Sequence, residues 1–136
     1  MSKEGGCYCG AIRYRTDAEP AVKAQCHCRE CQYFAGGSSN LTQGIPEADF
    51  SYTKGTPKQF TRSDLDSPVT RDFCGECGTQ LVSWSPALPG MALIKIGTLD
   101  DPSSFGGAQI AIFTTEKQRF HHIPADVETY DMLPAS

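Results

Sequence analysis

Seven cysteines in three short clusters are the feature of the sequence that indicates chemistry most specifically. In chain order the clusters are Cys7-Tyr-Cys9, Cys26-His-Cys28-Arg-Glu-Cys31 and Cys74-Gly-Glu-Cys77. Thiols at such short spacings are typical ligands of a tetrahedral zinc ion. If the two outer clusters combine, they form a closed four-sulfur site that stabilises a fold. The middle cluster then keeps three ligands and an open fourth position, which is the arrangement of a catalytic zinc.

Disulfides are the main alternative use of these thiols, since small extracellular proteins often form them. An odd number of cysteines cannot pair completely. The residues after Met1 also lack the apolar stretch of a secretory signal. The longest apolar run, Met91-Ala-Leu-Ile-Lys-Ile, is interrupted by Lys95 and is far shorter than the roughly 20 residues of a membrane span. The sequence therefore predicts a soluble, cytoplasmic protein with reduced thiols and no membrane partner.

Length and charge set limits on the fold and on the partners. The 136 residues, 39% of them hydrophobic, correspond to one domain that spans 1–136. The chain has 12 basic and 16 acidic residues, a net charge of −4, and no Lys/Arg run that could follow a phosphate backbone. We therefore expect no nucleic-acid partner, and these features do not indicate an oligomeric state.

Short runs of apolar and β-branched residues alternate with Gly, Pro, Asp and Ser, and this pattern predicts a mostly β fold with little helix. The expected strands cover residues 11–15, 21–25, 40–43, 50–53, 58–61, 69–73, 80–84, 92–97 and 109–113. Both outer cysteine clusters then lie at strand borders. A short helical turn from Arg29 is expected to carry Cys31 and to end at Gly36-Gly37. Its N–H groups would point at the middle cluster and favour thiolates.

The spacing of the middle cluster allows three interpretations. The cluster could form a second zinc site, a redox pair of Cys28 and Cys31, or a closed site completed by His27 or another residue. A redox pair would need a thioredoxin-like βαβ context, which the strand-rich surroundings do not offer. His27 lies between two ligands and is expected to point away from the metal, although its ordinary pKa would suit a ligand or a proton shuttle.

Three segments, taken together and in order, carry a family resemblance. They are Gly5-Gly-Cys7-Tyr-Cys9-Gly-Ala-Ile-Arg-Tyr14, Cys26-His-Cys28-Arg-Glu-Cys31-Gln and Phe73-Cys74-Gly-Glu-Cys77-Gly-Thr79. In these segments the chain resembles the glutathione-dependent formaldehyde-activating enzyme family, also called the centromere-protein-V/Gfa-like family. The resemblance implies an Mss4-like fold of packed antiparallel sheets and two zinc ions. It implies a structural zinc on Cys7, Cys9, Cys74 and Cys77, and a catalytic zinc on Cys26, Cys28 and Cys31.

The activity that the resemblance implies is the reversible addition of glutathione to formaldehyde, which gives S-hydroxymethylglutathione and is classed as carbon–sulfur lyase activity. An open three-sulfur zinc suits this reaction, because a substrate thiol in the fourth position loses its proton and can attack a small carbonyl. Four thiolates make the metal a poor Lewis acid for the aldehyde itself. The carbonyl oxygen then needs a separate proton donor, for which Tyr33, His27 and water are candidates. A site with three ligands is also expected to hold its zinc less tightly.

One departure from the family pattern bears on the substrate. Many members have Arg or Lys after the third cysteine of the middle motif, whereas this chain has Gln32 followed by Tyr33-Phe34. A cation for a substrate carboxylate is therefore missing at this position, and a small thiol other than glutathione fits the residues equally well. The alternative function is a non-catalytic, zinc-stapled binding or chaperone-like module. A weaker third hypothesis is a redox or metal sensor.

The remaining polar and aromatic residues are expected to be structural. His121 and His122 look like a metal pair, but neighbours in an extended segment face opposite sides, so surface or core roles are expected. Trp84 and Phe73 are assigned to the core. A solvated, passive loop is expected around three charged residues, Arg62, Asp64 and Asp66. The tail from residue 126 to residue 136 is expected to dock or fray.

Overall fold

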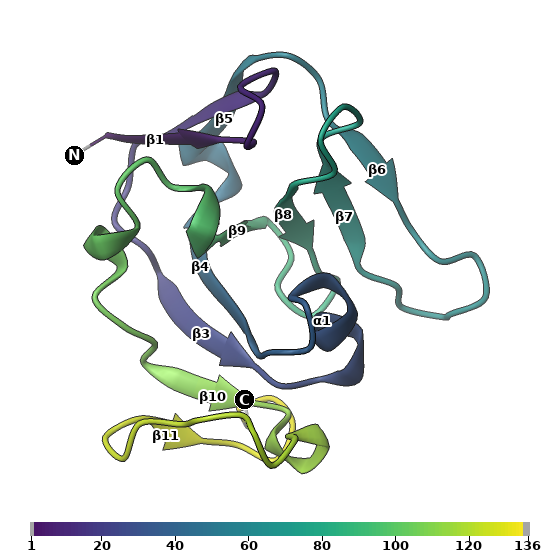
Figure 1. The fold of residues 1–136 in the computed structure, drawn as a ribbon, viewed down its shortest axis with the longest axis vertical. Helices are drawn as coiled ribbons and strands as arrows, with labels where there is room; N and C mark the ends of the chain where they lie inside the picture. Colours follow the sequence, from purple (N-terminus) through teal and green to yellow (C-terminus); the bar gives the residue numbers. More distant parts are fainter. Residues whose placement is uncertain (1, 135–136) are drawn as a thin grey trace.

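Two β-sheets organise residues 2–134, the part of the chain that this computed structural model describes (Figure 1). The smaller sheet is antiparallel, with strand order β1-β2-β5, and consists of Lys3–Gly6, Arg13–Thr16 and Phe50–Lys54. The larger sheet has the order β11-β10-β3-β4-β9-β8-β7-β6. Its strands are β3 Val22–Cys26, β4 Asn40–Pro46, β6 Lys58–Phe60, β7 Thr70–Phe73, β8 Gln80–Trp84, β9 Met91–Lys95, β10 Ile110–Ile112 and β11 Glu128–Thr129.

The larger sheet is mixed rather than purely antiparallel. β10 runs parallel to both of its neighbours, β3 and β11. The other neighbouring pairs in this sheet are antiparallel. Parallel neighbours cannot be joined by a tight hairpin, and the chain between β3 and β10 passes through most of the other strands before it returns. The sequence pattern of a strand does not reveal whether it runs parallel or antiparallel to its neighbours, because side chains alternate in the same way in both cases.

Helical structure among residues 2–134 is short. One α-helix, α1, covers Arg29–Phe34. Four 3₁₀ turns cover Glu47–Asp49, Ile96–Thr98, Pro102–Phe105 and Thr114–Glu116. No helix in this part of the chain is long and apolar enough to cross a membrane. The prediction of a mostly β protein with little helix is therefore confirmed.

All nine expected strands are found, as β2 to β10, with bounds that differ by up to three residues. Two further strands, β1 and β11, carry no apolar run. β1 reads Lys-Glu-Gly-Gly and is held by its pairing with β2. β11 docks part of the chain's tail on β10, so the described tail pairs with the sheet, while residues 135–136 lie outside the described part. Pairing rather than composition defines both strands.

The hydrophobic core lies between the two sheets. Tyr14 from β2 is fully buried against apolar side chains of β4, β8 and β9, and its hydroxyl hydrogen-bonds the Thr98 hydroxyl at 2.7 Å. Phe50 packs beside it, with ring centroids 5.5 Å apart. A Cβ atom on Gly5 would overlap the Thr98 carbonyl oxygen and the Tyr14 hydroxyl, so only glycine fits there. Trp84 packs against this core, as expected, whereas Phe73 is partly buried and lies outside the cluster.

A buried carboxylate ties the small sheet to the large one. Asp72 on β7 is 2% exposed and accepts three hydrogen bonds. The donors are the Tyr52 hydroxyl at 2.6 Å, the Gln59 amide at 2.8 Å and the Trp84 indole at 2.9 Å. Burial, followed by the bond to Asp72, raises the pKa of Tyr52. The carboxylate therefore organises donors from β5, β6 and β8 around one acceptor.

Replacement of Asp72 by alanine should lower the free energy of unfolding by about 3 kcal/mol, because up to three donors lose their acceptor in a buried site. Tyr52→Phe removes one donor only and should cost about 1 kcal/mol. Urea unfolding followed by circular dichroism measures both changes. Equal effects of the two substitutions would show that Asp72 matters only through Tyr52.

Candidate metal centres

The four thiols of the outer clusters meet in space. Sγ atoms of Cys7, Cys9, Cys74 and Cys77 all lie within 4.8 Å of one another. The Cys7–Cys9 sulfurs are 3.6 Å apart and the Cys9–Cys74 sulfurs 3.8 Å apart. Four sulfurs at about 2.3 Å from a tetrahedral zinc are separated by about 3.8 Å, whereas disulfide sulfurs are about 2.05 Å apart. The spacing fits a shared zinc ion and does not fit disulfides.

Backbone amides support these sulfurs. The Ile12 amide donates to Cys7 Sγ at 3.2 Å, and the Cys77 amide to Cys74 Sγ at 3.5 Å. Gly78 has a φ of +79°, which lets its amide turn back to the Cys74 carbonyl at 2.8 Å. Amides that donate to metal-bound sulfurs orient the ligands and spread their charge. The turns that hold the outer clusters therefore aim backbone amides at the sulfurs.

The three thiols of the middle cluster also meet. Sγ atoms of Cys26, Cys28 and Cys31 lie within 4.8 Å of one another, and no fourth His, Cys, Asp or Glu among the described residues joins this group. Cys26 ends β3, Cys28 is the N-cap of α1 and Cys31 lies within α1. The third thiol distinguishes the group from a simple pair of redox cysteines. The arrangement offers three ligands, one fewer than a tetrahedral metal needs.

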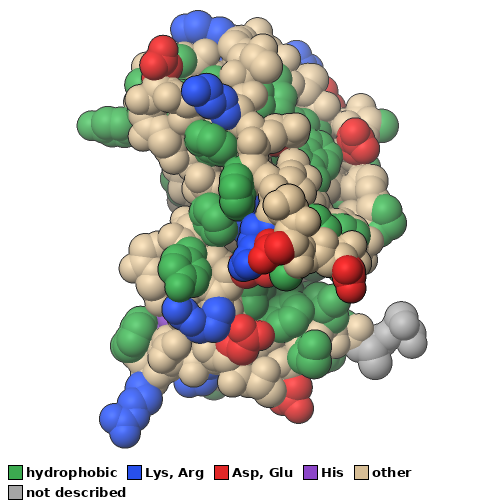
Figure 2. Space-filling view, turned by 90° about the vertical axis from the view of Figure 1, so that its right-hand side faces the viewer, with side chains coloured by type: hydrophobic (Ala, Val, Ile, Leu, Met, Phe, Trp, Pro, Cys, Tyr) green, Lys and Arg blue, Asp and Glu red, His purple; other side chains and the backbone are tan. Residues whose placement is uncertain are grey.

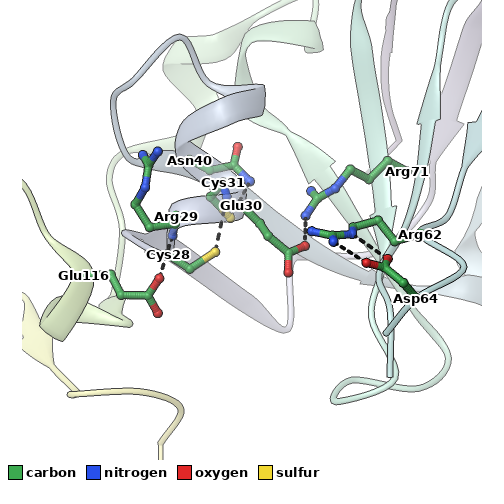
Figure 3. A network of polar contacts seen from close by, with 9 residues as sticks. All are labelled: Cys28, Arg29, Glu30, Cys31, Asn40, Arg62, Asp64, Arg71 and Glu116. Carbon is green, nitrogen blue, oxygen red and sulfur yellow. Dashed lines mark hydrogen bonds and ion pairs between the residues drawn. The ribbon is translucent and has the colours of Figure 1, made fainter. Parts of the chain in front are cut away.

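Hydrogen bonds fix the middle cluster at the start of α1. The Cys31 amide donates to Cys28 Sγ at 3.3 Å, and the Asn40 side-chain amide from β4 donates to Cys31 Sγ at 3.7 Å (Figure 3). α1 ends as expected, because Gly36 and Gly37 have φ values of +70° and +95°.

Hydrogen bonds among the three thiols shift their pKa values in opposite directions. Hydrogen bonds with Cys26 and then Cys28 lower the pKa of Cys31 to about 3. Hydrogen bonds with Cys28 and then Cys31 raise the pKa of Cys26. Thiols bind a metal ion in their deprotonated form, so a metal ion at this group would displace the protons that the thiols carry.

His27 faces away from these sulfurs. Its ring is fully buried, with Nε2 at 3.1 Å from the Gln25 amide nitrogen and Nδ1 at 2.9 Å from His121 Nδ1. His121 Nε2 in turn lies 2.8 Å from the Gly37 carbonyl. One proton arrangement satisfies all three contacts: Gln25 donates to His27, which donates to His121, which donates to Gly37. Burial, followed by the charge of His121, lowers the pKa of His27 to about 4. His27 therefore links β3 to the C-terminal segment as a neutral ring.

His121 and His122 separate as expected, since His121 is buried and His122 exposed. Tyr33, the other proton donor considered from the sequence, is 76% exposed, and its ring lies 5.0 Å from the Arg29 guanidinium carbon. Gln32 is buried and donates to the carbonyls of His27 and Glu116 at 2.9 and 3.0 Å. Gln32 thus anchors α1 and does not face a substrate.

Two cations that sequence reasoning passed over lie near the middle cluster. Lys95 on β9 is 8% exposed, and its Nζ has no hydrogen-bond partner among the described residues. Burial lowers the pKa of Lys95 to about 8, while the charges of the nearby thiols oppose this shift. Arg71 on β7 contacts Glu30 at 3.1 Å and lies 4.2 Å from the centre of the Phe34 ring. A lysine within an otherwise apolar central strand was the available sequence signal for Lys95.

A groove of about 550 Å³ lies between α1 and the segment that runs from the end of β6 into β7. Its walls combine aromatic and apolar side chains with three arginines, and its lining residues are Arg29, Glu30, Tyr33, Phe34, Phe60, Arg62, Leu65, Pro68, Val69 and Arg71. Figure 2 shows this face, where hydrophobic side chains lie beside basic and acidic ones around a hollow. Arg62 forms an ion pair with Asp64 at 2.6 Å (Figure 3). The loop that was expected to be passive therefore forms one wall of the groove.

The fold and the two cysteine groups define a β-sheet protein with a four-thiol centre and a separate three-thiol centre. The family model of the glutathione-dependent formaldehyde-activating enzyme matches residues 2–116, and the chain belongs to this family. The family assignment made from the three cysteine motifs is thereby confirmed.

One similar sequence and one similar solved structure were also found. A Halomonas elongata protein named "Putative glutathione-dependent formaldehyde-activating enzyme" is 32% identical over 94 residues, which cover 65% of this chain and 60% of that protein. The match thus spans less than two thirds of the relative's length. A crystal structure of a Rhodobacter sphaeroides protein superposes with a TM-score of 0.60 at 18% identity and covers 77% of this chain and 96% of the other. This second likeness concerns the fold alone.

Proposed function

We propose that the protein is a zinc-dependent enzyme that reversibly joins glutathione to formaldehyde and so acts as a carbon–sulfur lyase in the cleavage direction. The observation that carries this proposal is a group of three convergent thiols with no fourth protein ligand among the described residues, placed beside a groove lined by arginines. The family membership agrees with it. Cleavage and formation use the same site, because the adduct forms and breaks at one carbon–sulfur bond.

The two cysteine groups are assigned different tasks in this proposal. Cys7, Cys9, Cys74 and Cys77 would hold a structural zinc, and Cys26, Cys28 and Cys31 would hold the catalytic one. A zinc ion on three thiolates supplies a fourth position in which a substrate thiol is deprotonated at neutral pH. Asn40 and the Cys31 amide orient two of the three sulfurs by hydrogen bonds.

The groove beside α1 suits the rest of the glutathione molecule. Glutathione carries two carboxylates and a peptide backbone, and guanidinium groups bind carboxylates well. Arg62 is half exposed at the groove wall, and Arg71 lies deeper, with 6% of its side chain exposed. These arginines come from β7 and the loop before it, so they replace the cation that the sequence pattern lacks at Gln32.

The direct test is to measure the exchange between free formaldehyde and S-hydroxymethylglutathione by NMR with ¹³C-labelled formaldehyde. The zinc-loaded protein should accelerate this exchange above the spontaneous rate, in proportion to protein concentration. A zinc-loaded protein that binds glutathione without any acceleration would favour the non-catalytic binding module instead.

The groove predicts a specific effect of Arg62→Ala on substrate affinity. Loss of one charge-assisted contact should raise the KM for glutathione about tenfold and leave the dependence on formaldehyde unchanged. Arg15→Ala is a matched control, because Arg15 also pairs with an aspartate two residues on, at 2.8 Å, and lies in the small sheet. Equal KM values for the two variants would exclude the groove as the glutathione site.

A further inference from the structure

The ammonium group of Lys95 is buried without a hydrogen-bond partner among the described residues. Burial of an unpaired charge is costly, and such groups are normally paired or bind a ligand. Its Nζ also lies beyond hydrogen-bonding distance of the cysteine sulfurs, since no such contact is found in the described part of the chain. Lys95 therefore has three N–H donors without an acceptor among the described residues.

Strand register places Lys95 on the sheet face that carries the three-thiol group. Lys95 is opposite Thr42 on β4, and Asn40 lies two residues before Thr42 on the same strand. Cys26 on β3 is opposite Asn40. Because residues two apart on a strand share a face, Cys26, Asn40 and Lys95 all project to the same side of the sheet. The contact between Asn40 and Cys31 shows that α1 covers this side.

The same face carries a second unsatisfied donor. The Ser83 hydroxyl on β8 is buried and has no partner among the described residues. Ser83 is opposite Leu93, which lies two residues before Lys95 on β9, and Arg71 is opposite Ser83. Donors therefore extend across the sheet beneath α1, from Asn40 to Arg71. Within residues 2–134, neither Lys95 Nζ nor Ser83 Oγ has a hydrogen-bond partner.

We infer that Lys95 binds the oxygen atom of the substrate carbon that reacts at the three-thiol group, as part of the proposed function. In the addition direction the thiolate sulfur forms the bond to carbon, and the carbon–oxygen π electrons move onto oxygen. The oxygen then takes up one proton from solvent, which balances the proton that the thiol lost. Lys95 stabilises the negative charge on this oxygen by hydrogen bonding, the role that an all-sulfur metal site fills poorly. Ser83 is the second donor on the same face.

Lys95→Met tests this role, because methionine keeps the length of the side chain and removes the charge. We expect kcat/KM for formaldehyde to fall about 100-fold. The zinc content and the affinity for glutathione should stay within about twofold of wild type. The melting temperature should rise, because an unpaired buried charge is removed. Loss of the second zinc or of glutathione affinity in this variant would mean that Lys95 only balances the negative charge of the thiols, and would overturn the inference. An unchanged kcat/KM would overturn it as well.

Lys23→Met is the matched control on the same sheet. Lys23 on β3 donates to the Phe105 carbonyl at 2.8 Å, so its ammonium group has a hydrogen-bond acceptor. This substitution should lower the melting temperature and leave kcat/KM unchanged. A higher melting temperature for Lys95→Met and a lower one for Lys23→Met would show that Lys23 stabilises the fold and that Lys95 does not.

A binding measurement separates this inference from the proposed function. In wild-type protein with cobalt in both sites, mercaptoacetate should bind about tenfold more tightly than ethanethiol, because only mercaptoacetate brings an oxygen close to its sulfur. The preference should disappear in Lys95→Met and persist in Arg62→Ala. If the wild type has this preference but no turnover, the proposed function fails, whereas the assignment of Lys95 as the oxygen-binding residue stands. If the wild type binds both thiols equally, the assignment of Lys95 as the oxygen-binding residue is wrong even if turnover is observed.

Discussion

Replacement of Cys74 by serine is expected to unfold the protein. Cys74 is 1% exposed and packs in the hydrophobic core between the sheets, where it also approaches the sulfur of Cys9. A structural zinc contributes roughly 10–16 kcal/mol to small zinc domains, and a typical domain is stable by only about 5–15 kcal/mol. Loss of the zinc would therefore cost about as much free energy as the whole stability of a typical domain.

Circular dichroism and zinc analysis of purified Cys74→Ser test this expectation. The variant should lack the cooperative thermal transition of the wild type and should retain no tightly bound zinc. Cys28→Ser serves as the control for replacement of a cysteine by serine as such. A Cys74→Ser protein with an unchanged melting curve would contradict the assignment of the outer clusters to a structural zinc.

The same substitution at Cys28 is expected to abolish activity without unfolding the protein. Cys28 caps α1 through its sulfur, and serine is among the preferred residues at this position, so the helix should persist. The three-thiol group would keep only two sulfurs and would no longer retain its metal. The turnover rate should then fall by more than about 1,000-fold, because the substrate thiol loses its activating ion.

Zinc content gives the decisive readout for Cys28→Ser. One zinc per chain instead of two, with a melting temperature within a few degrees of wild type, is the expected result. Loss of both zinc ions, or of the folded state, would mean that the middle cluster is structural. Full activity with one zinc would mean that the reaction takes place elsewhere.

The parts of the structure that short patterns determine could be predicted from the sequence. Short apolar and β-branched runs between turn residues located β2 to β10, and the Gly36-Gly37 pair located the end of α1. Cys9 and Cys74 are 65 positions apart in the chain. Their convergence was nevertheless expected from the number of ligands in each cluster, because two pairs of thiols complete a tetrahedron. The binding of zinc ions by these cysteine groups is still a prediction.

Features that depend on tertiary register could not be predicted in this way. Lys95 reads as an interruption of an apolar strand, and only the pairing of β3, β4 and β9 places it on the face of Cys26. The parallel strand β10 and the contact between His27 and His121 both depend on the return of the C-terminal segment. The groove depends on a loop whose composition resembles any solvated turn.

The central claim is that the three-thiol group holds a metal with a position open to a substrate thiol. The most direct test is the visible absorption spectrum of the fully reduced, cobalt-substituted protein, recorded before and after addition of glutathione. We predict two cobalt ions per chain, with the bands of one ion shifted by glutathione in wild type and no such shift in Cys28→Ser. Two cobalt ions whose absorption bands do not shift with any added thiol, or a single bound cobalt ion, would contradict an open metal site at the three-thiol group.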